Sequence, residues 1–67
     1  MKVRFTAHAA EQMVARGICL EEVKRAIRRG STFKQAPDKY VAVFAYFSVV
    51  YRIIDNEHYI ITVQPYP

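Results

Sequence analysis

Apolar residues recur at two different spacings along this chain, and the spacing changes at Gly30. Before Gly30, two segments place apolar side chains three or four residues apart, the period of an α-helix with one buried face. After Gly30, runs rich in Val, Ile, Tyr and Phe alternate with turn residues, which is typical of a β-sheet. Residues 2–5 alternate polar and apolar and predict a short edge strand before the helices.

The first predicted helix spans residues 7–16, where four alanines favour helix formation. Thr6 precedes it as an N-cap, and Gly17 suits the left-handed position just past its end. We expect Ala10, Met13 and Val14 to point into the core.

The second predicted helix spans residues 20–29 and carries an apolar stripe of Leu20, Val23, Ala26 and Ile27. Acidic residues in its first turn and arginines in its last turn match the helix dipole at both ends. Cys19 occupies the N-cap place, and we interpret it as a weak cap and not as a nucleophile. Only three residues separate the two helices, which predicts a tight helical hairpin.

Four further strands are predicted at residues 32–35, 40–46, 49–55 and 58–64, with turns at 36–39, 47–48 and 55–57. Helices grouped before such a meander indicate an α+β domain covering residues 1–67. The predicted fold is a helical hairpin packed on one face of a three- to five-stranded antiparallel sheet, in the order (β)ααβββ(β). Within residues 49–54, apolar side chains occupy both odd and even positions and so would lie on both faces of the sheet. The second sheet face is therefore expected to expose an apolar patch that fits a partner or a homodimer.

The formal net charge of +4 is unevenly distributed. Six basic residues lie within sixteen positions that contain one acid, Asp38; they are Lys24, Arg25, Arg28, Arg29, Lys34 and Lys39. Such a patch can neutralise phosphates or dock an acidic protein. The alternative, equally weighted, is a solvated helix end that complements the dipole.

Several function classes lack the residues they need. No apolar run approaches the roughly 18 residues of a membrane span, and the first residues lack the apolar segment of a signal peptide. With a single cysteine, Cys19, and two histidines, the chain has no disulfide framework and poor material for a metal site. We therefore expect a cytoplasmic protein without metal or cofactor.

Candidate chemistry lies on the first helix, where His8, Gln12 and Arg16 form one row at intervals of four residues. Backbone N–H groups at a helix start favour an anion and a neutral imidazole that can act as a base. A guanidinium can bind a phosphate through two hydrogen bonds. The alternative is an ordinary helix surface on which Arg16 pairs with an acid such as Glu11 or Glu21.

On the sheet, Arg52, His58 and Thr62 are polar residues among apolar neighbours. A three-residue hairpin loop places Arg52 and Thr62 on one face together with His58, whereas a two-residue loop places Arg52 and Thr62 on opposite faces. The sequence leaves both registers open.

The residues that carry these features also form a recognisable frame. It reads F-T-x-H-A, then R-G-I, then E-E-V-x-x-A-I-x-x-G, then V-V-Y-R-I and I-I-T-V-x-P. From Phe5 to Pro65 this frame resembles an uncharacterised domain-of-unknown-function family of small prokaryotic proteins. That family is similar to the RelE-like toxins and, more distantly, to the barnase–colicin ribonucleases. At the second N-cap the family usually has Ser where this chain has Cys19.

The resemblance implies a metal-independent endoribonuclease that acts on mRNA as the toxin of a toxin–antitoxin pair. Its partners would be an antitoxin protein and RNA or the ribosome. On that hypothesis His8, Arg16 and Thr62 are catalytic, and the residues that bind RNA phosphates are Arg52, Arg25, Arg28, Arg29 and Lys34. The alternatives are a non-catalytic RelE-like module that binds protein or RNA, and a homodimeric structural protein.

Overall fold

The computed structural model describes residues 1–66, which form two helices and five strands. In chain order the elements are β1 (Val3–Phe5), α1 (Ala7–Arg16), α2 (Leu20–Arg29), β2 (Ser31–Ala36), β3 (Lys39–Phe44), β4 (Phe47–Ile54) and β5 (Glu57–Pro65). Both helices have the predicted bounds. The strands agree with the predicted ranges to within about two residues.

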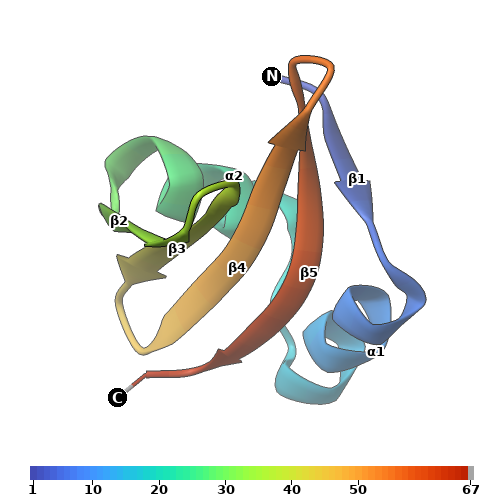
Figure 1. Cartoon of the computed structure of the whole chain (residues 1–67). Helices are drawn as coiled ribbons and strands as arrows, with labels where there is room; N and C mark the ends of the chain where they lie inside the picture. The colour runs from blue at the N-terminus through green and yellow to red at the C-terminus, as the bar shows by residue number, and fades with distance from the viewer. Residues whose placement is uncertain (67) are drawn as a thin grey trace.

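The five strands form one sheet in the order β1-β5-β4-β3-β2 (Figure 1). β2, β3, β4 and β5 are a meander of antiparallel neighbours, whereas β1 pairs with β5 in parallel. The predicted α+β fold, with its helices on one face of the sheet, is confirmed. The predicted sheet was antiparallel throughout, whereas β1 joins it in parallel. β1 is the expected short edge strand. Parallel neighbours need a long connection between them, and both helices and the rest of the meander lie between β1 and β5 in the chain.

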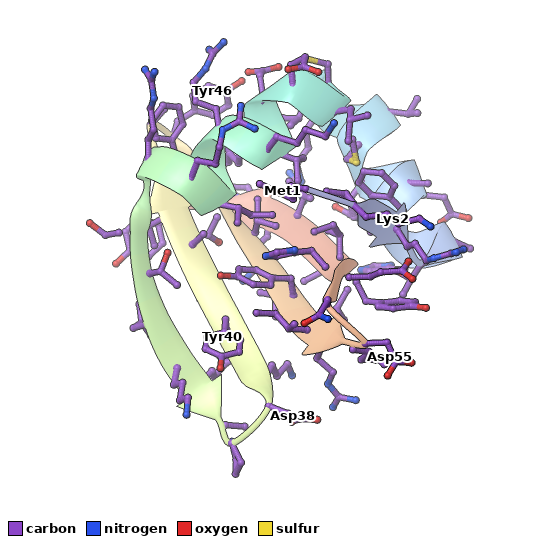
Figure 2. All side chains as sticks on the ribbon, turned by 90° about the horizontal axis from the view of Figure 1, so that it is seen from above. Met1, Lys2, Asp38, Tyr40, Tyr46 and Asp55 are labelled. Carbon is purple, nitrogen blue, oxygen red and sulfur yellow. The ribbon has the colours of Figure 1, made fainter. Side chains whose placement is uncertain are left out.

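The core lies between the helices and one face of the sheet. Its buried residues come from both helices, from the connection between them and from the three central strands: Ala9, Ile18, Val23, Ala26, Ala42, Phe47, Val49, Tyr51, Ile60 and Val63. We call this side of the sheet the helix face and the other side the open face. Figure 2, seen from above, shows both helices together on one side of the molecule.

The two helices divide the helix face between them, since α1 packs on β5 and β1 while α2 packs on β3 and β4. The two helices of the predicted hairpin pack mainly on the sheet and not on each other. The predicted core side of α1 is wrong in part. Met13 packs on the core, but Ala10 is exposed, Val14 is 84% exposed, and Ala9 is buried instead. A helix at the edge of the sheet buries only a narrow stripe of its surface.

The turn between β3 and β4 lies at Ala45 and Tyr46, and the predicted turn at Phe47 and Ser48 is wrong. Phe47 is 1% exposed and meets Phe44 edge to face, with ring centroids 6.3 Å apart. A two-residue hairpin loop needs a residue with positive φ, and Ala45 adopts φ 55°. Burial of the Phe47 ring outweighs the turn preference of Ser48.

Two glycines end the helices for different physical reasons. Gly17 adopts φ 67°, the left-handed conformation predicted for it. Gly30 has an ordinary φ of −74° but lies where α2 meets β3. A Cβ at Gly30 would lie 2.5 Å from the carbonyl oxygens of Ala26 and Val43, both of them backbone atoms.

A row of rings extends the core along the helix face. Tyr40 stacks on Tyr51 with centroids 5.5 Å apart, and Tyr51 meets His58 at 5.3 Å. Burial lowers the pKa of His58, and its Nδ1 is buried without a hydrogen-bond partner in the described residues. Burial likewise raises the pKa of Tyr51, against a hydrogen bond with Thr32 that lowers it.

We predict that Gly30→Ala lowers the free energy of unfolding by about 2 kcal/mol, because the new methyl group forces the backbones of α2 and β3 apart. Gly17→Ala is the matched control. It meets no atom within 4 Å and should cost only the strain of a positive φ, about 1 kcal/mol. Urea denaturation followed by circular dichroism measures both. Equal losses in the two variants would contradict a packing role for Gly30.

We also predict that stability falls as the pH drops from 7 to 5.5. Burial in the native fold lowers the pKa of His58 below its ordinary value near 6.5, so the unfolded chain takes up this proton more readily and acid favours the unfolded state. His58→Gln should flatten this decline, and His8→Gln should leave it in place. Urea midpoints at each pH provide the measurement, and a decline that persists in full in His58→Gln argues against this origin.

Candidate functional site

The start of α1 is fastened to β5 by Thr6. The Thr6 hydroxyl accepts a hydrogen bond from the Ala9 N–H at 3.0 Å, which is the predicted N-cap. The same hydroxyl donates to the Ile61 carbonyl at 2.9 Å, and the Thr6 N–H donates to the Ile60 carbonyl at 3.0 Å. The first turn of α1, which carries His8, therefore begins beside β5 where β1 ends.

The predicted row on α1 is present on the surface of the helix. His8 and Arg16 are exposed and Gln12 is half-buried. Arg16 Nε donates to Gln12 Oε1 at 3.0 Å, so its partner is a neutral amide and not Glu11 or Glu21. The hydrogen bond orients the guanidinium along the helix, and no carboxylate within residues 1–66 pairs with it. An exposed imidazole and an exposed guanidinium on one helix flank are available to a phosphate from solvent.

The register of the last hairpin agrees with neither of the two alternatives. Its loop has two residues, Asp55 and Asn56, both with positive φ, and pairs Arg52 with Tyr59. By alternation alone, Thr62 would then lie on the face opposite Arg52. The register shifts between Val50 and Tyr51, however, where a β-bulge adds one residue to β5.

The bulge returns Thr62 to the face of Arg52. Thr62 lies opposite Val50, which precedes Arg52 by two residues and so shares its face. His58 pairs with Ile53 and takes the helix face, where it meets Tyr51. The structure therefore brings Arg52 and Thr62 together on the open face and separates His58 from them.

The centre of the open face is filled by small apolar side chains. Val41 and Val50 are only 5% and 4% exposed although neither belongs to the helix-face core. The exposed apolar patch that we expected there is reduced to the margins, chiefly Phe33 at 50% and Ile54 at 45%. Arg52 stays exposed at this face, and its Nε lies 3.8 Å from Asp38 Oδ2.

The β-bulge and the hydrogen bond from the Thr6 hydroxyl to β5, which we call the Thr6 tether, fall on the same residue of β5. Ile61, which accepts the Thr6 hydroxyl, is the residue that the bulge inserts next to Thr62. The first turn of α1 and the strand segment that carries Thr62 are thus joined at one point of the backbone. We take this junction as the centre of the candidate site. The structure does not bring all four predicted residues onto one face, because α1 with His8 and Arg16 packs on the helix face and Arg52 and Thr62 lie on the open face.

The basic residues of α2 form a separate group. Arg25, Arg28 and Arg29 are exposed, and within residues 1–66 none of them forms an ion pair. Lys34 on β2 is exposed too, with Nζ 5.9 Å from the centroid of the Tyr40 ring. α2 and β2 lie at one edge of the sheet and α1 at the other (Figure 1). The structure therefore does not join these cations to the His8 row.

Two features were not found from the sequence. The ring row of Tyr40, Tyr51 and His58 depends on strand register, which no local pattern predicts. An apolar groove of about 390 Å³ runs beside the free flank of α1 and is lined by Phe5, Ala10, Met13, Val14, Gly17, Ile18 and Cys19. The spacing of Ala10 and Val14 was a signal for it, although we assigned these residues to the core.

Two negative findings apply to the described part of the chain. No three His, Cys, Asp or Glu residues among positions 1–66 are grouped so that they could hold a metal ion. No helix within the same range is long and apolar enough to cross a membrane.

Comparison with known proteins adds a family and a fold. The chain is similar in structure to a chain of the toxin–antitoxin complex RelBE2 from Mycobacterium tuberculosis, with a TM-score of 0.63 and 19% identity. The match covers 97% of this chain and 96% of that one, which shows a RelE-like fold. Comparison with curated proteins gave no match. The family model described as a domain of unknown function, DUF4258, matches residues 5–64, and the chain therefore belongs to that family.

Proposed function

We propose that this protein is a metal-independent endoribonuclease and the toxin of a toxin–antitoxin pair. The RelE-like fold supports a toxin-like role, since the similar structure is that of a toxin–antitoxin complex. The observation that carries the proposal is the junction of Thr6 with Ile61, which sets the turn of His8 beside the strand of Thr62. A cytoplasmic location follows from this proposal, because mRNA and ribosomes are found there.

The reaction needs only groups that the candidate site offers. A base removes the proton of an RNA 2′-hydroxyl, and the resulting oxygen attacks the adjacent phosphorus. The 5′-oxygen of the next nucleotide leaves with a proton from an acid, and a cyclic phosphate remains on the first fragment. Charge builds up on the phosphoryl oxygens during the attack, so cations fixed beside them make the largest contribution.

Each residue then has a defined role. His8 is the general base or acid, because it is the exposed imidazole on α1. Arg16 binds the phosphate, held along the helix by its hydrogen bond to Gln12. Arg52 is a second phosphate ligand once RNA displaces its distant partner Asp38, and Thr62 orients the substrate from the same face. Arg25, Arg28, Arg29 and Lys34 bind flanking phosphates of the RNA.

We predict that His8→Ala lowers the rate of RNA cleavage at least about 100-fold, the range expected for loss of an acid–base group. His58→Ala is the matched control, because the His58 ring packs against Tyr51 with its Nδ1 buried, whereas His8 is exposed. Cleavage is measured by gel electrophoresis of a labelled mRNA with and without ribosomes. Circular dichroism verifies that both variants are folded.

The outcomes separate the roles of the two imidazoles. A large loss in His8→Ala with near-normal cleavage in His58→Ala supports the assignment. Unchanged cleavage in His8→Ala removes that residue from the mechanism. If the unmodified protein cleaves no RNA under either condition, the proposal of a ribonuclease fails.

A second candidate function is a RelE-like module that binds RNA without cleaving it. The observation in its favour is the group Arg25, Arg28 and Arg29, which is exposed, free of carboxylate partners in residues 1–66 and distant from the His8 row. Such a surface binds phosphates by releasing counterions, and no acid–base group is needed.

We predict that the triple substitution R25E/R28E/R29E weakens RNA binding and makes it less dependent on salt. Each lost phosphate contact should reduce the slope of log affinity against log salt by roughly 0.7 for a single strand. Fluorescence anisotropy of a labelled RNA at several salt concentrations measures this slope. The double substitution E11Q/E57Q, which removes acids outside α2, should not flatten it. A slope unchanged by R25E/R28E/R29E would show that these arginines do not contact RNA.

A further inference from the structure

The outer edge of β2 is the one long strand edge that nothing covers in residues 1–66. β2 is last in the sheet order and pairs only with β3, and all of its residues except Ala36 are exposed. The opposite edge is covered, because β1 pairs with the first half of β5 and α1 packs along that strand. An open edge offers unpaired backbone donors and acceptors to another strand.

The hydrogen-bond pattern of the sheet identifies which backbone groups face outward. Ala45 and Tyr46 form a two-residue loop, so Phe44 and Phe47 are the hydrogen-bonded pair that closes the hairpin. Hydrogen-bonded and non-hydrogen-bonded pairs then alternate along β3. The N–H and C=O groups of Val43 and Val41 therefore point to β2 and not to β4.

On β2, Ser31 lies opposite Val43 and Phe33 opposite Val41, and these pairs form the backbone hydrogen bonds between the two strands. The N–H and C=O groups of Thr32 and Lys34 therefore point away from the sheet. The register shift between Lys34 and Ala36 ends regular pairing at that point. The free edge thus offers four backbone groups, the N–H and C=O of Thr32 and of Lys34.

The two sides of this edge differ in chemistry. Thr32 and Lys34 pair with Ala42 and Tyr40, so their side chains lie on the helix face, the side that also carries α2 with Arg28 and Arg29. Phe33 pairs with Val41 and lies on the open face, where half of its surface is exposed. β2 itself contains no acid. The edge is therefore cationic on one side and apolar on the other.

We propose that the free edge of β2 binds an extended segment of a partner protein that adds to the sheet as an antiparallel strand. The segment alternates acidic residues, which face Lys34 and the end of α2, with apolar residues, which pack beside Phe33. Charge complementarity and the alternation of a strand select this occupant. The inference concerns a partner surface and does not depend on RNA cleavage.

A second copy of this chain fits the edge poorly. Two β2 strands side by side would bring Lys34 and the arginines at the ends of both α2 helices close together, with no acid between them. Like charges opposite one another destabilise a strand pair. RNA fits the charge but makes no use of the alternating backbone groups at Thr32 and Lys34.

The test uses the whole protein and a nine-residue peptide with blocked ends in which Glu alternates with Val. We expect binding by fluorescence anisotropy and, by NMR, slower hydrogen exchange at the amides of Thr32 and Lys34 with no change at Phe33. Lys34→Pro removes one outward N–H and no internal bond, which an edge strand tolerates. It should weaken binding at least about 10-fold more than Lys34→Ala, which removes the charge alone.

A second measurement leaves the protein unaltered, in case Lys34→Pro does not fold. N-methylation of the peptide at its Glu residues blocks the N–H groups that face β2 in an antiparallel pair, and should abolish binding. Methylation at the Val residues should be tolerated. Equal affinity of the two methylated peptides overturns the proposal. Equal losses in Lys34→Pro and Lys34→Ala without amide protection do so too, because they indicate a purely electrostatic surface such as RNA would use.

Discussion

The arrangement of α1 and the sheet depends on the hydroxyl of Thr6. It caps α1 through Ala9 and donates to the Ile61 carbonyl, so the same oxygen begins the helix and fixes it to β5. β1 pairs with the edge of β5 as far as Ile60. Beyond that point the Thr6 hydrogen bonds hold the start of α1 against the same edge. A chain this short buries a smaller share of its surface than a larger domain does, so one hydroxyl that makes both contacts adds stability without further residues.

Both helices were predictable to the residue because their limits are encoded locally. Thr6 and Gly17 bound α1, and at α2 the Glu22 side chain accepts the Cys19 N–H at 3.1 Å and closes the first turn. The order of the strands along the chain was predictable for the same reason, whereas the parallel place of β1 beside β5 was not. Which face of α1 is buried was not, since Val14 and Met13 are both apolar and only the position of β5 decides between them.

The candidate site could be predicted as a set of residues but not as a geometry. His8 and Arg16 share a helix flank by their spacing alone. The relation of Arg52 to Thr62 depends on a bulge that no turn residue signals and that reverses the outcome of a two-residue loop. Long-range pairing decides register, and here one inserted residue determines whether two polar side chains share a face.

The two faces and the two edges of the sheet give the small chain separate surfaces. The helix face supplies the core, and the tether and bulge on β5 organise the candidate site at one edge. The cations of α2 and the free backbone of β2 lie at the other edge. Because β3 and β4 separate these edges, a partner strand on β2 would leave the His8 row open to solvent. An inhibitory partner that bound there would have to extend beyond β2, across the open face or around α2, to reach Arg52 or His8.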